Sequence, residues 1–131
     1  KAGPGGYGIA ALGKDRRWMV MIVGDLIGKG IFQVVEEGDD LSREITGIFC
    51  CDFLSVAMGR APSMSAWVTV MGNVNTIAVA TLADVSCVIL AENAQADEMC
   101  LTRAKQQGVT LLATEEPVFE AALKVHDMLH G

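Results

Sequence analysis

The sequence predicts a layered α/β domain in which helices flank a mostly parallel sheet. Short apolar runs rich in β-branched residues alternate along the chain with helical segments. Residues 66–70 and 86–90 are two such runs, and residues 75–83 between them are small and apolar, as in a helix packed against a sheet. Two strands joined by one helix imply a parallel unit with a right-handed crossover.

The elements before this unit follow the same alternation. Residues 23–29 are expected to form a helix, because Gly30 is typical of the position just after a helix end. A strand is expected at residues 32–35, and it leads into an acidic turn at residues 36–40. The next strand is predicted at residues 44–51, with a glycine interrupting it.

The remaining elements carry recognisable start and stop signals. A helix at residues 52–58 has Asp52 as its expected N-cap. A helix at residues 97–107 begins with acidic residues and ends at a glycine, and a strand at residues 109–113 follows it. The last helix, residues 117–129, begins with a proline and carries an apolar stripe.

Length and charge limit the classes of protein that fit. A chain of 131 residues, about half of them hydrophobic, predicts one domain with a packed core. The formal net charge of -6 argues against non-specific binding to nucleic acid or to an anionic membrane, since both need a basic surface. No apolar run approaches the ~18–20 residues of a spanning helix, and the first residues lack the order of a signal peptide. We therefore expect a cytoplasmic protein with no nucleic-acid or membrane partner.

Residues 1–18 differ in composition from the rest of the chain. They contain a glycine-rich segment at residues 3–8 and a short basic cluster. A glycine-rich phosphate loop requires a preceding strand, and the two residues before this segment cannot supply one. We expect residues 1–18 to be a flexible linker or tail and residues 19–131 to form the globular domain.

Signatures of catalysis and of metal binding are absent from the sequence. It contains no Walker A motif, no nucleophile elbow and no zinc-ligand spacing. The cysteines are Cys50, Cys51, Cys87 and Cys100. They form no CxxC pair, which predicts reduced and mostly buried thiols. His126 and His130 share a face of the last helix, but no acidic residue or cysteine is spaced to complete a site. We expect no catalytic residue, no metal and no cofactor.

Polar residues follow each predicted parallel strand at the point where the strand ends. In chain order they are Asp52 and Ser55, then Gly72, Asn73 and Asn75, then Glu92 and Asn93, then Thr114 and Glu115. The carboxyl ends of parallel strands meet at one edge of a sheet, where ligands commonly bind. The alternative is that Asp52, Asn73 and Asn75 only cap helices.

These positions define the predicted ligand-binding residues. They are Arg43, Asp52, Gly72, Asn73, Asn75 and Glu92. The two asparagines offer both donors and acceptors to a nucleobase or amide. Arg43 is expected to supply positive charge to a phosphate.

The sequence resembles a DRTGG domain. The residues that carry the resemblance are LSREITG at residues 41–47, DFLSVAMG at 52–59, WVTV at 67–70 and NTIAVA at 75–80. The motifs occur in order within a similarity that extends from about residue 20 to residue 129. The resemblance therefore covers nearly the whole expected globular part.

Membership of this family implies a fold like the N-terminal domain of bacterial HPr kinase/phosphorylase and a non-catalytic, regulatory role. The kinase half of those enzymes carries a Walker A motif, which this chain lacks. Stand-alone relatives occur in anaerobic bacteria in the company of hydrogenase genes. Arg43, Asp52, Asn73 and Asn75 match motif positions, whereas Ser42 stands where related sequences commonly have aspartate.

Three functional hypotheses follow. The first is a ligand-sensing module that binds an adenine nucleotide or a small anion at the strand ends. We expect this module to be a homodimer, because the chain has more apolar residues than a small monomer can bury. The second is a protein-interaction domain without a small-molecule ligand that docks on a larger enzyme. The third is a small enzyme acting on a nucleotide or acyl phosphate, with Asp52 and Glu92 as its acid or base.

Overall fold

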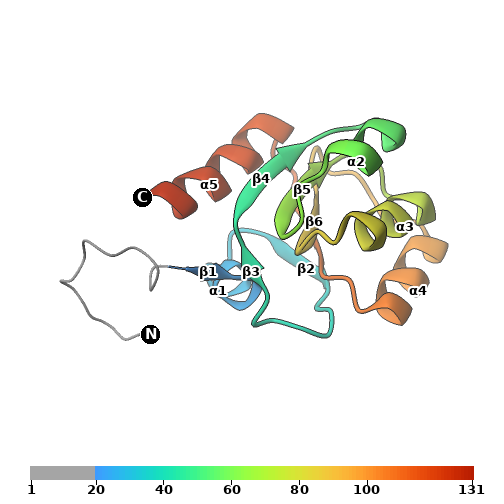
Figure 1. Ribbon diagram of the computed structural model, residues 1–131, viewed down its shortest axis with the longest axis horizontal. Coiled ribbons are helices and arrows are strands. Elements are labelled where there is room, and N and C mark those ends of the chain that lie inside the picture. The colour runs from blue at the N-terminus through green and yellow to red at the C-terminus, as the bar shows by residue number, and fades with distance from the viewer. Residues whose placement is uncertain (1–19) are drawn as a thin grey trace.

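Residues 20–131 are described by the computed structural model, and they form a layered α/β fold around a mixed sheet (Figure 1). The strands are β1 (Met21–Ile22), β2 (Gln33–Glu36), β3 (Glu44–Ile45), β4 (Gly47–Cys50), β5 (Ser65–Thr69), β6 (Cys87–Leu90) and β7 (Leu111–Ala113). The helices are α1 (Val23–Gly28), α2 (Leu54–Arg60), α3 (Val74–Ala83), α4 (Glu98–Gln107) and α5 (Val118–His130). The linker predicted at residues 1–18 lies outside the described residues.

The main sheet has five strands in the order β2–β7–β6–β5–β4. Strands β4 to β7 are parallel neighbours in chain order, with Val68 of β5 opposite Ile89 of β6. Strand β2 pairs antiparallel with β7, with Gln33 opposite Ala113 and a register irregularity further along. The predicted layered α/β class is confirmed, and the sheet is mixed because one edge strand runs against the other four.

Helices α2, α3 and α4 cover one face of the sheet. Each joins two adjacent parallel strands, and right-handed crossovers between neighbours in a constant direction place successive helices on the same face. Trp67 and Val88 point into this layer and pack with Ile77 of α3 and Cys100 of α4, all of them buried. Figure 1 shows the three helices together on one side of the sheet.

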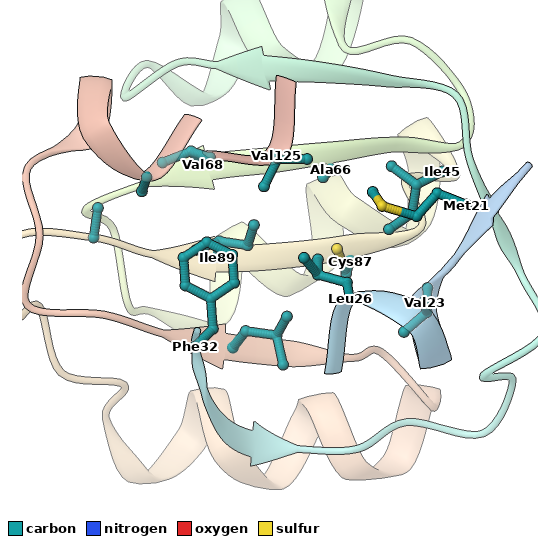
Figure 2. Packing of buried hydrophobic residues seen from close by; sticks show 13 residues of the cluster. Met21, Val23, Leu26, Phe32, Ile45, Ala66, Val68, Cys87, Ile89 and Val125 are labelled. Atoms are coloured by element: carbon teal, nitrogen blue, oxygen red, sulfur yellow. The ribbon is translucent and has the colours of Figure 1, made fainter. Parts of the chain in front are cut away.

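Helices α1 and α5 cover the opposite face. Val68 and Ile89 alternate with the residues of the first layer and pack with Leu26 of α1 and Val125 of α5 (Figure 2). All four side chains are fully buried or nearly so. The sheet is therefore covered on both faces, which explains why its strands are apolar without polar alternation.

The strand predicted at residues 44–51 is divided in two. It breaks at Thr46, whose N–H donates to the carbonyl of Met64 at 2.9 Å. Strand β3 leaves the main sheet and pairs antiparallel with β1, with Ile45 opposite Met21, while β4 joins β5. Strand β1 was not predicted, because a two-residue strand has no periodicity to detect.

All five predicted helices are present in the described part of the chain. The largest shift is at the second helix, predicted at residues 52–58 and found at Leu54–Arg60. Within residues 20–131, no helix combines the length and the apolar character needed to cross a membrane.

Candidate functional site

A crevice lies at the carboxyl edge of the sheet, between the ends of β6 and β7. The loop after β6 leads to α4 on one face, whereas the loop after β7 leads to α5 on the other. Adjacent strands whose connections diverge in this way leave an opening between the loops, which is where ligands bind in open α/β sheets. The opening has a volume of about 630 Å³ and includes the start of β2 in its wall.

Apolar and polar groups share the lining of this crevice. Ile31 and Leu101 are among its apolar side chains. Three carboxamides, from Gln33, Asn93 and Gln95, also line it. The volume is within the range of small-molecule sites, and the exposed lining is more polar than apolar.

The backbone at the end of β6 is held in an unusual conformation. Glu92 and Asn93 are consecutive left-handed residues, with φ of 61° and 59°. Their N–H groups donate to the loop after β7, Glu92 to the carbonyl of Glu116 at 2.8 Å and Asn93 to that of Thr114 at 3.0 Å. A left-handed conformation costs a non-glycine residue about 1–2 kcal/mol. The two hydrogen bonds offset this cost and fix the separation of the loops that form the crevice.

Glu92, a predicted ligand-binding residue, holds helix α5. Its Oε2 accepts a hydrogen bond from the N–H of Val118 at 3.0 Å. Pro117, the N-cap residue of α5, has no side-chain cap of its own. Glu92 therefore provides the missing acceptor from a distant part of the chain, and its carboxylate does not line the crevice.

Charged residues of the β7–α5 region complete the lining. Lys124 of α5 donates from Nζ to Oε2 of Glu116 at 2.7 Å. The other carboxylate oxygen of Glu116, Oε1, is shielded from solvent and has no hydrogen-bond partner among the described residues. Glu115 lines the crevice as well and is exposed.

Asp52 does not cap α2, contrary to the sequence prediction. The N-cap residue of α2 is Phe53, and the helix begins at Leu54. Oδ1 of Asp52 instead accepts hydrogen bonds from Oγ1 of Thr69 at 2.7 Å and from the N–H of Val70 at 2.8 Å. It thereby ties the end of β4 to the end of β5. The sequence predicts an N-cap because Asp52 directly precedes a helical segment. It does not show that Thr69 and Val70 lie beside Asp52 on the neighbouring strand.

The two predicted asparagines, Asn73 and Asn75, have different roles. Oδ1 of Asn73 accepts from the N–H groups of Asn75 at 2.9 Å and Thr76 at 3.3 Å, which confirms the capping alternative for Asn73. The Asn75 side chain is exposed and forms no hydrogen bond within residues 20–131. Neither asparagine lines the crevice.

Gly72 does not line the crevice, but it contacts the loop that forms one of the crevice walls. A Cβ at this position would clash with the carbonyl group of Gln95, lying 2.8 Å from the carbonyl carbon. The Gly72 carbonyl in turn accepts from the N–H of Asp97 at 2.9 Å. The missing side chain of Gly72 therefore lets the loop after β5 touch the loop that forms one wall of the crevice.

Arg43 lies at the opposite edge of the sheet, which corrects its predicted place at the strand ends. Its Nη2 contacts Oδ1 of Asp84 at 2.7 Å and donates to the Asp84 carbonyl at 2.7 Å. Asp84 follows α3 and precedes β6, so this pair lies where the parallel strands begin. Hydrogen bonds from Arg43 and then from Ser63 hold the pKa of the Asp84 carboxyl below its usual value.

Several lining residues were not among the predicted site residues. Gln33 could not be placed from the sequence, because nothing in it shows that β2 pairs with β7. Lys124 lies more than one turn into α5, beyond the polar positions that follow the strands in the sequence. Gln95 lies two residues past Asn93, and Asn93 did belong to the polar set at the strand ends.

The cysteines and histidines do not form a second site in the described part of the chain. Within residues 20–131, no three potential ligands gather in a way that could hold a metal ion. The rings of His126 and His130 lie 4.3 Å apart, centroid to centroid, near the other end of α5. Burial raises the pKa of the Cys87 thiol to about 12.

No family model matches this chain, and no curated protein is found to be similar to it. The resemblance to DRTGG domains therefore rests on the motif residues of the sequence and stays a prediction.

Proposed function

We propose that this protein is a non-catalytic regulatory module that binds a small molecule in the crevice between the β6–α4 and β7–α5 loops. The observation that carries the proposal is the position of the crevice, where the connections of β6 and β7 part to opposite faces of the sheet. Its volume of about 630 Å³ is within the range of small-molecule sites.

A non-catalytic role is favoured by the structural partners of three nearby carboxylates, whereas the exposed Glu115 lines the crevice without one among the described residues. General acid–base catalysis needs a carboxylate that can exchange a proton with the substrate. Glu92 caps α5, Glu116 pairs with Lys124, and Asp52 joins β4 to β5. Each of these groups has a structural partner, so the enzyme hypothesis that relied on Asp52 and Glu92 is the weaker one.

We place the domain, as part of this proposal, with stand-alone DRTGG domains and their fold resembling the N-terminal domain of HPr kinase/phosphorylase. The layered α/β architecture is compatible with that assignment. A cytoplasmic location belongs to the same proposal and is supported by the free state of Cys50, Cys51, Cys87 and Cys100.

Protein association is a second candidate function, favoured by exposed apolar side chains. Phe53, Leu82, Met99 and Phe119 are 64%, 72%, 64% and 66% exposed. Large side chains left in water favour a homodimer or a larger partner enzyme. Size-exclusion chromatography with light scattering measures this directly. A dimer supports association between copies, and a monomer at high concentration contradicts it.

Ligand screening with matched variants tests the proposed site. Thermal shifts and calorimetric titrations with a panel of metabolites should identify a stabilising compound. Gln95→Ala removes a carboxamide that lines the crevice and should weaken binding of that compound about tenfold. Asn75→Ala removes an exposed carboxamide outside the crevice and should leave the affinity unchanged.

If Asn75→Ala weakened binding and Gln95→Ala did not, the ligand would bind at the end of β5 instead. Loss of binding in Asn75→Ala together with full binding in Gln95→Ala contradicts the proposed location. A complete absence of stabilising compounds contradicts the proposal of a ligand-binding module.

A further inference from the structure

We infer that the crevice selects a ligand that donates hydrogen bonds from nitrogen and carries no net negative charge, such as a nucleoside or an amine. The inference rests on the proposed function and names the chemistry of the ligand at the same site. It departs from the sequence-based expectation of a nucleotide phosphate or a small anion.

The charge of the lining is the first reason. Glu115 and Glu116 both line the crevice, and within residues 20–131 Lys124 is the one lysine or arginine that does so. The Lys124 ammonium is already engaged with Oε2 of Glu116 at 2.7 Å. Positive charge is therefore cancelled inside the crevice, and the charge that remains is the negative one of Glu115.

The helix ends beside the crevice are the second reason. A helix N-terminus often binds phosphate through its free N–H groups. At α5 the N–H of Val118 donates to Glu92, and at α4 the N–H of Cys100 donates to Oδ1 of Asp97 at 2.8 Å. Each carboxylate occupies the place that an anion would take and repels a second negative charge.

An unpartnered carboxylate oxygen of Glu116, a lining residue, is the third reason. Oε1 of Glu116 is shielded from water and has no donor among the described residues. An acceptor without a donor is unfavourable. The Glu116 side chain lines the crevice and is 36% exposed, so a rotation of its carboxylate would bring this oxygen to a ligand N–H. Hydrogen bonds from a donor to a charged acceptor are among the stronger ones in proteins.

The remaining side chains fit a planar, nitrogen-rich group. The carboxamides of Gln33, Asn93 and Gln95 carry both donors and acceptors, which is the pattern that the edge of a nucleobase presents. Gln95 uses one N–H to donate to the Asn93 carbonyl at 3.1 Å and keeps its oxygen and its second N–H. Ile31 and Leu101 provide apolar surface for the faces of a ring.

Calorimetric titration of the wild-type protein with four probes tests the inference. Adenosine and adenosine monophosphate share a base and differ in the phosphate, inorganic phosphate is the anion alone, and putrescine is an amine without a base. Adenosine should bind at least about tenfold more tightly than adenosine monophosphate, and inorganic phosphate should give no binding heat. Binding of putrescine without adenosine would identify an ammonium group as the donor and would also support the inference.

Charge reversal at Glu115 makes the test specific to the crevice. Glu115→Lys should shift the preference toward adenosine monophosphate by about tenfold or more. Asp127→Lys introduces the same change of charge near the other end of α5 and should leave the preference unchanged. Glu115 and Asp127 are both exposed, so neither variant is expected to disturb the fold.

Two results would overturn the inference. One is tighter binding of adenosine monophosphate than of adenosine by the wild-type protein. If Gln95→Ala then weakened binding of both by about tenfold, the proposed site would stand without the inferred ligand class. The other is the absence of binding by adenosine and putrescine alike. In that case the metabolite panel decides the proposed function separately, through any compound whose binding depends on Gln95.

Discussion

Gly72 and Gln95 show how a single backbone position shapes the crevice. The loop after β5 passes against the loop after β6 at this point, and the contact excludes even a methyl group. The same loops are joined by the hydrogen bond from Asp97 to the Gly72 carbonyl. A residue outside the crevice therefore determines where one of its walls lies.

We expect Gly72→Ala to lower the free energy of unfolding by about 1–3 kcal/mol, because the backbone around Gln95 must move to accept the methyl group. Urea denaturation measures the change. Gly59→Ala is the matched control, since a Cβ at Gly59 meets nothing within 4 Å and Gly59 lies inside α2. The control should raise stability by about 0.5–1 kcal/mol, and an equal loss in both variants would contradict the proposed contact.

Asp84 makes a stability contribution that depends on pH. Hydrogen bonds from Arg43 and Ser63 lower its pKa in the folded state, so this contribution is present above the unfolded pKa and is lost as the pH falls through the folded one. The unfolding free energies of wild type and Asp84→Asn should therefore differ most above about pH 5, and the difference should shrink as the pH falls through the lowered pKa of the folded state. The Asp84 side chain is 60% exposed, so the difference should stay under about 1 kcal/mol.

Asparagine is the suitable replacement at Asp84 because both residues tolerate the left-handed conformation found there, with φ of 63°. Denaturation at several pH values gives the comparison. A difference that persists unchanged at pH 2 would show that the ionised carboxylate is not its cause.

At the level of single residues, sequence reasoning placed Asp52, Asn73 and Glu92 at the carboxyl edge of the sheet, where the structure has them, but it assigned several roles wrongly. The capping role of Asn73 has a local signature, a polar residue just before a helix, and it is confirmed. Asp52 has the same signature but bonds to Thr69 and Val70 on the neighbouring strand. Arg43 pairs with Asp84, far along the chain. The roles of Asp52 and Arg43 depend on contacts with distant segments of the chain, which a local sequence pattern does not show.

Helix α5 depends on a cap that comes from another element. Glu92, at the end of β6, accepts from the first N–H of the helix, where Pro117 offers no side-chain acceptor. The last helix is therefore fastened to the crevice loop by a carboxylate and to the opposite face of the sheet by apolar packing. A change at the crevice loop acts directly on the first turn of α5.

Glu92→Ala should destabilise the protein by about 1 kcal/mol, because the N–H of Val118 loses its acceptor. Hydrogen exchange of the amides in the first turn of α5 should become faster, while the amides of α3 keep their protection. Glu92→Gln retains a side-chain oxygen and should lose less than half as much stability. Equal losses in the two variants would show that the acceptor is not responsible.

The order and type of the elements were largely predictable, because each helix and most strands have local signals. The predicted runs at residues 66–70, 86–90 and 109–113 correspond to β5, β6 and β7. The division of residues 44–51 and the pairing of β2 with β7 were not predictable. Strand pairing is a tertiary property, and a single sequence records only which segments favour strands.

On the scale of the whole molecule, the sheet separates two apolar cores. Cys87 belongs to the core under α1 and α5, and Cys100 to the core under α2, α3 and α4. Figure 2 shows Cys87 within its layer. Each core therefore contains one buried thiol, whose chemical modification measures the opening of that side of the sheet.

A thiol reagent should modify both buried thiols at the same rate, the rate of global unfolding. The reason is that a domain of this size unfolds as a cooperative unit. Burial raises the pKa of Cys87 to about 12 and also raises that of Cys100, so neither thiol reacts in the folded state. Burial and the Asp52 carboxylate raise the pKa of Cys50 as well, but Cys50 is exposed and should therefore react first. Mass spectrometry of a Cys50→Ser variant follows the two buried sites, and unequal rates would show that the layers open separately.

The first and last described residues of the chain lie on the same part of the surface. Val20 and Gly131 line the same surface depression, together with Met21 and Met128. Residues that share a surface depression in this way can be joined by a short linker, so the described part of the chain can be circularly permuted or inserted into a surface loop of another protein. A short peptide bridge from Gly131 to Val20 would leave both cores in place, so a host protein could carry this domain as an insertion held at a single attachment point.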